Sequence, residues 1–255
     1  MNVADLLGAL DDEIGLSRAA SWDEVGLQIG APDGELGEVG VCHEISTGLI
    51  TEAVQRGIAT IVSYHPLLFS PTTTFVDGAS AEGRAFRLAS AGISLIVVHT
   101  AFDATPGGSA DALASTLGLD VGTSFGCEDE AETRCVGRAG NVDPMTLAEL
   151  RDIVASRLAT HVRLAGDESA VVSSVAVVPG SGGSFIRTAA ALADVLVTGD
   201  LKHHDVVQAR DLGLSVLDAG HVPTERPGVD ALYDVLRTMT DTVHRIDIDP
   251  HQWKD

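Results

Sequence analysis

The stretch ISLIVVHTAFDATPGGSADAL at residues 93–113 has a counterpart at residues 214–232, LSVLDAGHVPTERPGVDAL. Each stretch runs from an apolar, β-branched segment through a histidine to a carboxylate four residues later, and then through Pro-Gly to Asp-Ala-Leu. This order predicts a strand, a polar segment and a helix in both halves of the chain. We therefore predict two pseudo-symmetric α/β lobes, each presenting a histidine and a carboxylate to a cleft between them.

The rest of the chain alternates in the same way, as expected for α/β layers. Residues 120–132 are acidic and lack periodicity, so we place the boundary there and predict lobes at 1–125 and 126–255. Predicted strands cover 38–43, 59–64, 93–98, 134–139, 161–165, 173–178, 193–198, 214–218 and 243–248. Predicted helices cover 2–15, 47–57, 81–91, 108–118, 144–158, 184–191, 203–211 and 228–238.

The composition limits the class of protein. The chain has 255 residues, of which 45% are hydrophobic, so it can bury a full-sized core. A net charge of −21 argues against general nucleic-acid binding and against anionic membrane surfaces, because both need clustered basic residues. We find no signal peptide and no apolar run long enough to span a membrane. The three cysteines show no disulfide framework, so we expect a cytoplasmic protein.

Histidines and carboxylates gather where predicted strands end. Four segments qualify, at residues 64–66, 99–103, 200–205 and 221–225. In open α/β sheets, ligands bind beyond the carboxyl ends of the strands. Imidazole and carboxylate groups suit zinc, iron or manganese, and the chain lacks the paired cysteines of a thiolate structural zinc site. The sequence therefore predicts a catalytic metal site.

Each candidate also has a plain structural explanation. His65 could bond to a neighbouring loop, and Asp103 could cap the Pro-Gly turn that follows it. The pair His203-His204 could be a solvated helix start, and Asp23-Glu24 reads as a pair of solvated loop carboxylates. From these residues alone, ligand and structural roles remain open.

The spacing of His221 and Glu225 would put both on one face of a helix. Pro223 and Pro227 favour instead a loop that enters a helix. This segment too remains open between a ligand role and a structural one.

The glycine-rich stretch at residues 179–184 follows a predicted strand. Its candidate anion-binding residues are Gly180, Gly182, Gly183 and Ser184. Backbone amides at a helix start can hold a phosphate, but the stretch lacks the Lys-Ser/Thr of a P-loop. A tight structural turn is the alternative.

Several blocks together resemble a known family. Ser21-Trp22-Asp23-Glu24-Val25-Gly26-Leu27-Gln28 is similar to the Trp-Asp-Asn-Val-Gly-Leu-Gln opening of the NIF-three-like dinuclear metal centre proteins, often named type 2 homologues of GTP cyclohydrolase I (GTP cyclohydrolase 1 type 2 homologues). His65-Pro66-Leu67 resembles the next block, followed by His99-Thr100 with Asp103 and Pro106-Gly107-Gly108, and by Asp218-Ala219-Gly220-His221 with Thr224-Glu225. The resemblance covers nearly the whole chain.

The resemblance implies a two-lobed α/β subunit of the short form, without an inserted domain, and commonly a toroidal homohexamer. It also implies one or two divalent metal ions per subunit in the cleft. The family's ligands fall on His65, Asp103, His221 and Glu225, with His99 as a further candidate.

The chain departs from the family at Tyr64. The family's His-His-Pro is Tyr64-His65-Pro66 here. A phenol is a poor zinc ligand at neutral pH because its pKa is about 10. We therefore predict that one metal position is weakened, takes another metal such as ferric iron, or recruits His99.

The function that these features predict is metal-dependent hydrolysis of a small-molecule substrate, with a nucleotide or phosphoester as the candidate class. Two cations would activate water. Asp103 and Glu225 would neutralise the cations and act in catalysis, while His65 and His221 would fix the geometry. The alternative is a non-catalytic metal-binding protein that acts as a metal chaperone, a reservoir or a regulatory ring assembly.

Overall fold

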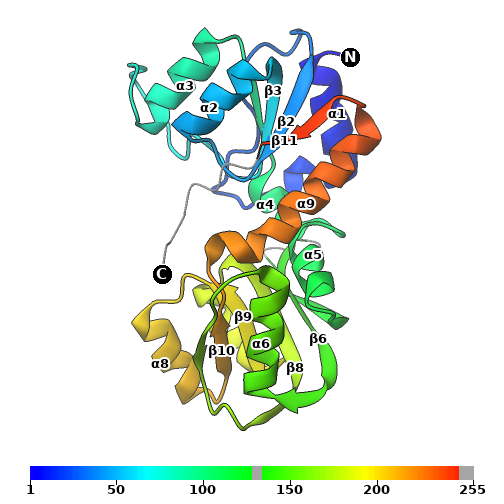
Figure 1. Ribbon diagram of the computed structural model, residues 1–255, viewed down its shortest axis with the longest axis vertical. Helices are drawn as coiled ribbons and strands as arrows, with labels where there is room; N and C mark the ends of the chain where they lie inside the picture. Colours follow the sequence, from blue (N-terminus) through cyan, green and yellow to red (C-terminus); the bar gives the residue numbers. More distant parts are fainter. Residues whose placement is uncertain (128–133, 247–255) are drawn as a thin grey trace. The chain divides into compact units, whose positions relative to one another are not determined.

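The computed structural model describes residues 1–127 and 134–246. The chain divides into two compact units, each with its own sheet (Figure 1). The first unit comprises Met1–Phe102 and Val229–Asp255, and the second comprises Asp103–Gly228. The prediction of two α/β lobes is confirmed. The predicted boundary at residue 125 does not coincide with these limits, because the last helical turns and the last strand return to the first unit.

The first sheet has the strand order β1-β4-β3-β2-β11. Strands β11, β2, β3 and β4 are parallel, and β1 pairs antiparallel at the edge. The strand bounds are β1 Gly26–Ile29, β2 Glu38–Cys42, β3 Ile58–Ser63, β4 Ser94–Val97 and β11 Val243–Arg245. Strand β1 was not predicted, because only the first of its four residues is buried.

Helices cover both faces of this sheet. Helices α2 (Thr47–Gln55) and α3 (Ala81–Ser90) pack on one face, and α1 (Val3–Ile14) packs on the other together with the last turns of α9 (His221–Met239) (Figure 1). Helix α1 begins with a capping box between Asn2 and Asp5 and ends at Gly15, which has a φ of 71°. These local signals explain why its predicted bounds lie within a residue of the observed ones.

The second sheet has the order β5-β6-β8-β9-β10-β7, with β8, β9 and β10 parallel. Helices α5 (Ser109–Thr116) and α6 (Leu147–Leu158) share a core with one face, and α7 (Ile186–Ala190) and α8 (His203–Asp211) share a core with the other. The strand bounds are β5 Asp120–Cys127, β6 Cys135–Thr146, β7 Arg163–Ala165, β8 Val171–Ser181, β9 Val195–Gly199 and β10 Ser215–Asp218. Short 3₁₀ turns occur at Leu16–Arg18 and Gly183–Phe185.

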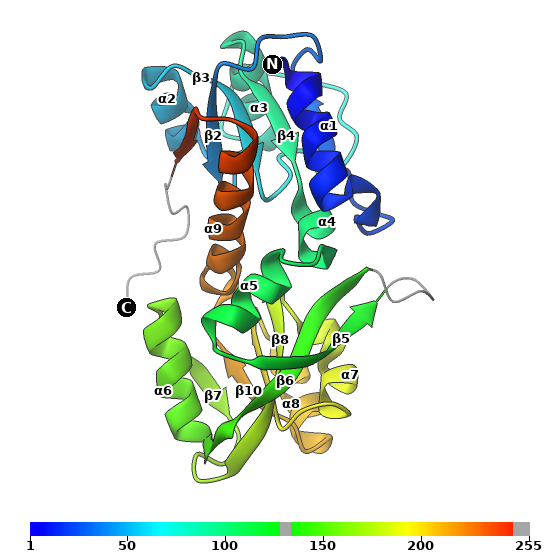
Figure 2. The ribbon, with the colours of Figure 1, turned by 90° about the vertical axis from the view of Figure 1, so that its right-hand side faces the viewer.

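Strand β5 corrects the prediction for residues 120–132. It pairs antiparallel with β6 at the sheet edge (Figure 2), and its first five residues are exposed, so it carries no apolar alternation. The remainder of the predicted stretch lies outside the described residues, as do residues 247–248 of the last predicted strand.

A disulfide joins Cys127 to Cys135, which face each other across β5 and β6. The expectation that the cysteines would form no pair is therefore wrong. The pairing of the two strands, which the sequence did not reveal, brings these two residues together. Cys42 is buried and does not take part in this disulfide.

Both repeat histidines begin a helix. His99 starts α4 (His99–Ala104) after β4, and His221 starts α9 after β10. The predicted loop at 221–227 is wrong. Pro223 lies in the first turn of α9, where a backbone N–H would have no partner within the helix, and Pro227 lies inside the helix, where it removes one backbone hydrogen bond. Within the described residues, no helix combines the length and the apolar character needed to cross a membrane.

Candidate metal centre

Three neighbouring parallel strands of the first sheet each lead into a histidine. His43 follows β2 directly, and His65 and His99 come two residues after β3 and β4. The strand register aligns Cys42 with Ser63 and Ser63 with Val97, so the three strands end at one edge of the sheet. The imidazole centroids of His43 and His65 lie 4.7 Å apart, and those of His65 and His99 lie 4.9 Å apart.

Backbone hydrogen bonds continue between the segments beyond the strand ends and position these histidines. The His65 amide donates to the His43 carbonyl at 2.8 Å, and the His99 amide donates to the Tyr64 carbonyl at 2.9 Å. The Ser63 hydroxyl also donates to the His65 carbonyl at 2.7 Å. The three imidazoles are therefore attached to rigid backbone.

Tyr64 is fully buried in the core that contains α1. Its ring stacks on His43 at 5.7 Å with an interplanar angle of 19°. His43 follows β2, and β2 pairs with β3, the strand that ends just before Tyr64. Sequence reasoning missed His43. A signal was present, since the residue lies at the end of the predicted strand 38–43, where ligand residues are expected.

His99 is bound to a buried carboxylate. Its Nδ1 lies 2.9 Å from Oδ2 of Asp23, whose side chain is 1% exposed. Asp23 also accepts from the backbone amide and the hydroxyl of Thr100. Burial raises the pKa of Asp23, but the hydrogen bonds from His99 and Thr100 outweigh it and lower the pKa below 3.8. The interpretation of Asp23 as a solvated loop carboxylate is wrong.

The second unit holds a histidine between two carboxylates. His221 Nε2 lies 3.1 Å from Glu225 Oε1, one helical turn along α9, and Nδ1 lies 2.8 Å from Asp200 Oδ2. Glu225 is buried. The hydrogen bond with Glu225 is the main cause that raises the pKa of His221 to about 9, against desolvation, with a further contribution from Asp200. Without a metal, His221 is therefore protonated at neutral pH.

The glycine-rich stretch lies against carboxylates of the same unit. A Cβ on Gly180 would stand 2.3 Å from Glu225 Oε1, and one on Gly183 would stand 2.8 Å from Asp205 Oδ2. The Gly180 amide donates to the Thr224 hydroxyl at 3.0 Å. Glycine is thus needed here for close approach of the backbone to acidic side chains. An anion role for Gly180, Gly182, Gly183 and Ser184 stays a prediction, and these neighbouring carboxylates disfavour it.

The remaining candidates occupy other places. Asp103 lies in α4, is partly buried and belongs to the second unit, and its ligand role stays a prediction. His203 and His204 open α8 as exposed residues, with ring centroids 5.3 Å apart. Their arrangement is compatible with the solvated helix start that we considered.

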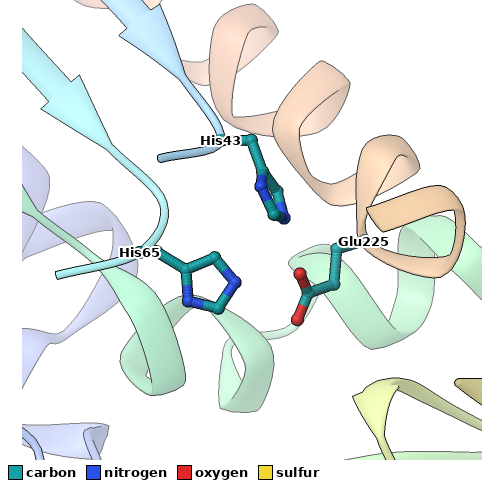
Figure 3. Close-up of side chains that lie close together, drawn as sticks. All are labelled: His43, His65 and Glu225. Atoms are coloured by element: carbon teal, nitrogen blue, oxygen red, sulfur yellow. The ribbon is translucent and has the colours of Figure 1, made fainter. Parts of the chain in front are cut away.

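The donor types fit a divalent cation. Figure 3 draws His43 and His65 of the first unit and Glu225 of the second, and each of these side chains offers one ligand atom of a type that binds such a cation. Imidazole nitrogen with carboxylate oxygen suits zinc, iron or manganese. Because Cys127 and Cys135 are joined in a disulfide, neither offers a thiolate.

The sequence matches the model of the family Duf34/NIF3 (NGG1p interacting factor 3) over residues 1–252. It is 38% identical over 234 residues to a Streptomyces coelicolor protein named GTP cyclohydrolase 1 type 2 homolog, covering 88% of this chain and 82% of that protein. It is 29% identical to a Clostridium perfringens protein of the same name, covering 95% and 94%. Among solved structures, Staphylococcus aureus hypothetical protein SA1388 superposes with a TM-score of 0.90 at 27% identity, covering 100% of this chain and 99% of that one.

Proposed function

This chain belongs to the Duf34/NIF3 family, and we propose that it is a metal-dependent hydrolase. The observation that carries the proposal is the row of histidines at the ends of β2, β3 and β4. Placing three imidazoles at one sheet edge costs free energy, because each polar ring loses part of its solvation, and this favours a role in binding. Ligand sites in such sheets lie at this edge.

We assign the cation to His43 and His65 of the first unit together with Glu225 and His221 of the second. The support is chemical, since each unit supplies imidazoles. In each unit a carboxylate is hydrogen-bonded to one imidazole, Asp23 to His99 and Asp200 to His221. The chain also passes from one unit to the other through α9, which carries both His221 and Glu225 near its start. Asp103 is proposed as a further carboxylate of the centre.

A divalent cation, when bound, would supply Lewis acidity toward water and substrate at neutral pH. The protein's part is to hold and orient. His43 and His65 would fix the cation through nitrogens attached to the sheet edge. Glu225 would add negative charge. His221 would have to release the proton on Nε2, which faces Glu225, to water before this nitrogen could hold a cation, and Asp200 would keep the ring in place through Nδ1.

We propose a nucleotide or phosphoester as the substrate class. We also propose that the protein is a cytoplasmic homohexamer, by likeness to its family. The disulfide between Cys127 and Cys135 argues against the cytoplasmic location, since structural disulfides are rare in reducing cytoplasm. Light scattering on the purified protein tests the oligomer.

The test of the function combines elemental analysis with turnover. Protein purified without chelator should contain zinc, iron or manganese, and His43→Gln with His65→Gln should lose it. A panel of phosphoesters and cyclic amides should be hydrolysed by the wild type and not by Glu225→Gln. The matched control is Asp194→Asn, a carboxylate that accepts two backbone amides at 3.0 Å in the second unit and contacts no candidate ligand through these bonds.

The possible outcomes separate hydrolase from carrier. Bound metal without turnover on any substrate, and with rapid transfer to a chelator, would reject the hydrolase and support the metal-binding alternative. Two tightly held ions with no contribution from Tyr64 or His99 would reject the weakened second position.

A further inference from the structure

Two histidines, one in each unit, share the same arrangement. His99 and His221 each begin a helix shortly after a parallel strand. In each, Nδ1 faces an aspartate oxygen, at 2.9 Å from Asp23 and 2.8 Å from Asp200. A carboxylate without a proton can only accept, so Nδ1 must carry the hydrogen in both rings. In His99, Nε2 is then the ring nitrogen left for other chemistry, whereas Nε2 of His221 lies 3.1 Å from Glu225 Oε1.

Asp23 is also held in place by hydrogen bonds other than the one with His99. The Thr100 hydroxyl donates to Asp23 at 2.5 Å and accepts from the Ala20 amide at 2.9 Å. The Thr100 amide donates to the same Asp23 oxygen at 3.2 Å. The bonds from Thr100 and from His99 all end on Oδ2 of Asp23, so they hold this oxygen against the imidazole.

Backbone strain accompanies both pairs. His99 has a φ of 30° and Asp200 a φ of 54°, both in the left-handed region that favours glycine. Such conformations are retained where the surrounding structure holds them, and they cluster at functional sites. In each pair, one member therefore occupies a conformation that costs free energy unless its surroundings hold it.

We propose that Asp23 is a positioning residue for His99, holding it as the Nδ1–H tautomer so that Nε2 can bind a cation. The cation itself rests on the proposed function, whereas the tautomer does not. His99 thereby becomes a functional histidine that the group of His43, His65 and Glu225 does not include.

Nitrogen-15 NMR of histidine-labelled, metal-free protein tests the tautomer directly. The His99 signal is assigned by its loss in His99→Gln. Neutral His99 in the wild type should carry its proton on Nδ1, and Asp23→Asn should shift the population toward Nε2–H. Asp194→Asn is the matched control and should leave the spectrum of His99 unchanged.

Zinc affinity, measured by competition with a fluorescent chelator, is the second readout. Asp23→Asn should weaken zinc binding about 10-fold, as loss of a carboxylate behind a ligating imidazole does elsewhere. Asp194→Asn should bind as the wild type does. Far-UV circular dichroism confirms that each variant is folded.

The outcomes are distinct from those of the proposed function. A proton on Nε2 of neutral His99 in the wild type, which requires no variant to fold, would overturn the proposal. Unchanged tautomer and unchanged zinc affinity in Asp23→Asn would also overturn it. If instead His65→Gln and Glu225→Gln bind zinc as tightly as the wild type, the proposed metal centre fails, while the tautomer result still decides the role of Asp23.

Discussion

Removing the charge of Glu225 tests the electrostatics of the second unit in the absence of metal. Glu225 and Asp200 both accept from the His221 ring, and together they raise the pKa of His221 from 6.5 to about 9, with the Glu225 hydrogen bond as the largest cause. Because the unfolded chain lacks these partners, the native state binds this proton more tightly. Protonated His221 therefore stabilises the fold.

The magnitude follows from the two pKa values. A rise from 6.5 to about 9 corresponds to ~3 kcal/mol at most. The His221 side chain is 31% exposed, so solvent screening reduces the expected contribution to ~2 kcal/mol. This stability is fully present below pH 6.5, declines as the pH rises, and is lost above about pH 9.

Urea unfolding of chelator-treated protein measures this effect. The wild type should lose ~2 kcal/mol of unfolding free energy across that pH window, and Glu225→Gln should lose clearly less. Titratable groups that the two proteins share cancel in the difference. Parallel curves for the two proteins would refute the reasoning that Glu225 holds the proton on His221.

Two further predictions concern β5 and β6. The Cys127–Cys135 bond closes a loop with a sequence separation of 8, so reduction by a dithiol should lower the free energy of unfolding by ~2 kcal/mol in urea titrations. The stability of a double variant, Cys127→Ser with Cys135→Ser, should not change with the reductant. Equal stability of oxidised and reduced wild type would contradict the expectation. Arg138, with its side chain 6% exposed, binds both oxygens of Asp111 at 2.6 and 3.0 Å. Arg138→Met should cost ~3 kcal/mol in the same assay, and a loss within experimental error would show that water replaces the pair.

Much of the fold could be predicted from periodicity, because most elements bury a face. Leu6, Leu10 and Ile14 repeat on the buried side of α1, and residues 58–63, four of which are apolar, are nearly all buried in β3. Elements without a buried pattern were missed, such as β5, whose early residues are exposed. Helix α9 was predicted to begin late, because Pro227 reads locally as a stop although packing keeps the helix continuous.

In the candidate site, residues marked by local sequence could be predicted, and pairs of residues brought together by the fold could not. His65 and His221 could be recognised because they follow strands and stand in family-like blocks. Asp23 could not be assigned a partner, since His99 lies 76 residues away in sequence. The pairing of His43 with His65 depends on the register of β2 and β3, which a single sequence does not specify.

The discontinuity of the first unit has a consequence for biosynthesis. Strand β2 has β11 as one of its neighbours, and β11 comes from residues 243–245, which the ribosome makes after the whole of the second unit. The second unit is one uninterrupted segment, Asp103–Gly228. We expect the second unit to fold first in the nascent chain, while the sheet of the first unit keeps an open edge at β2 until β11 has been made.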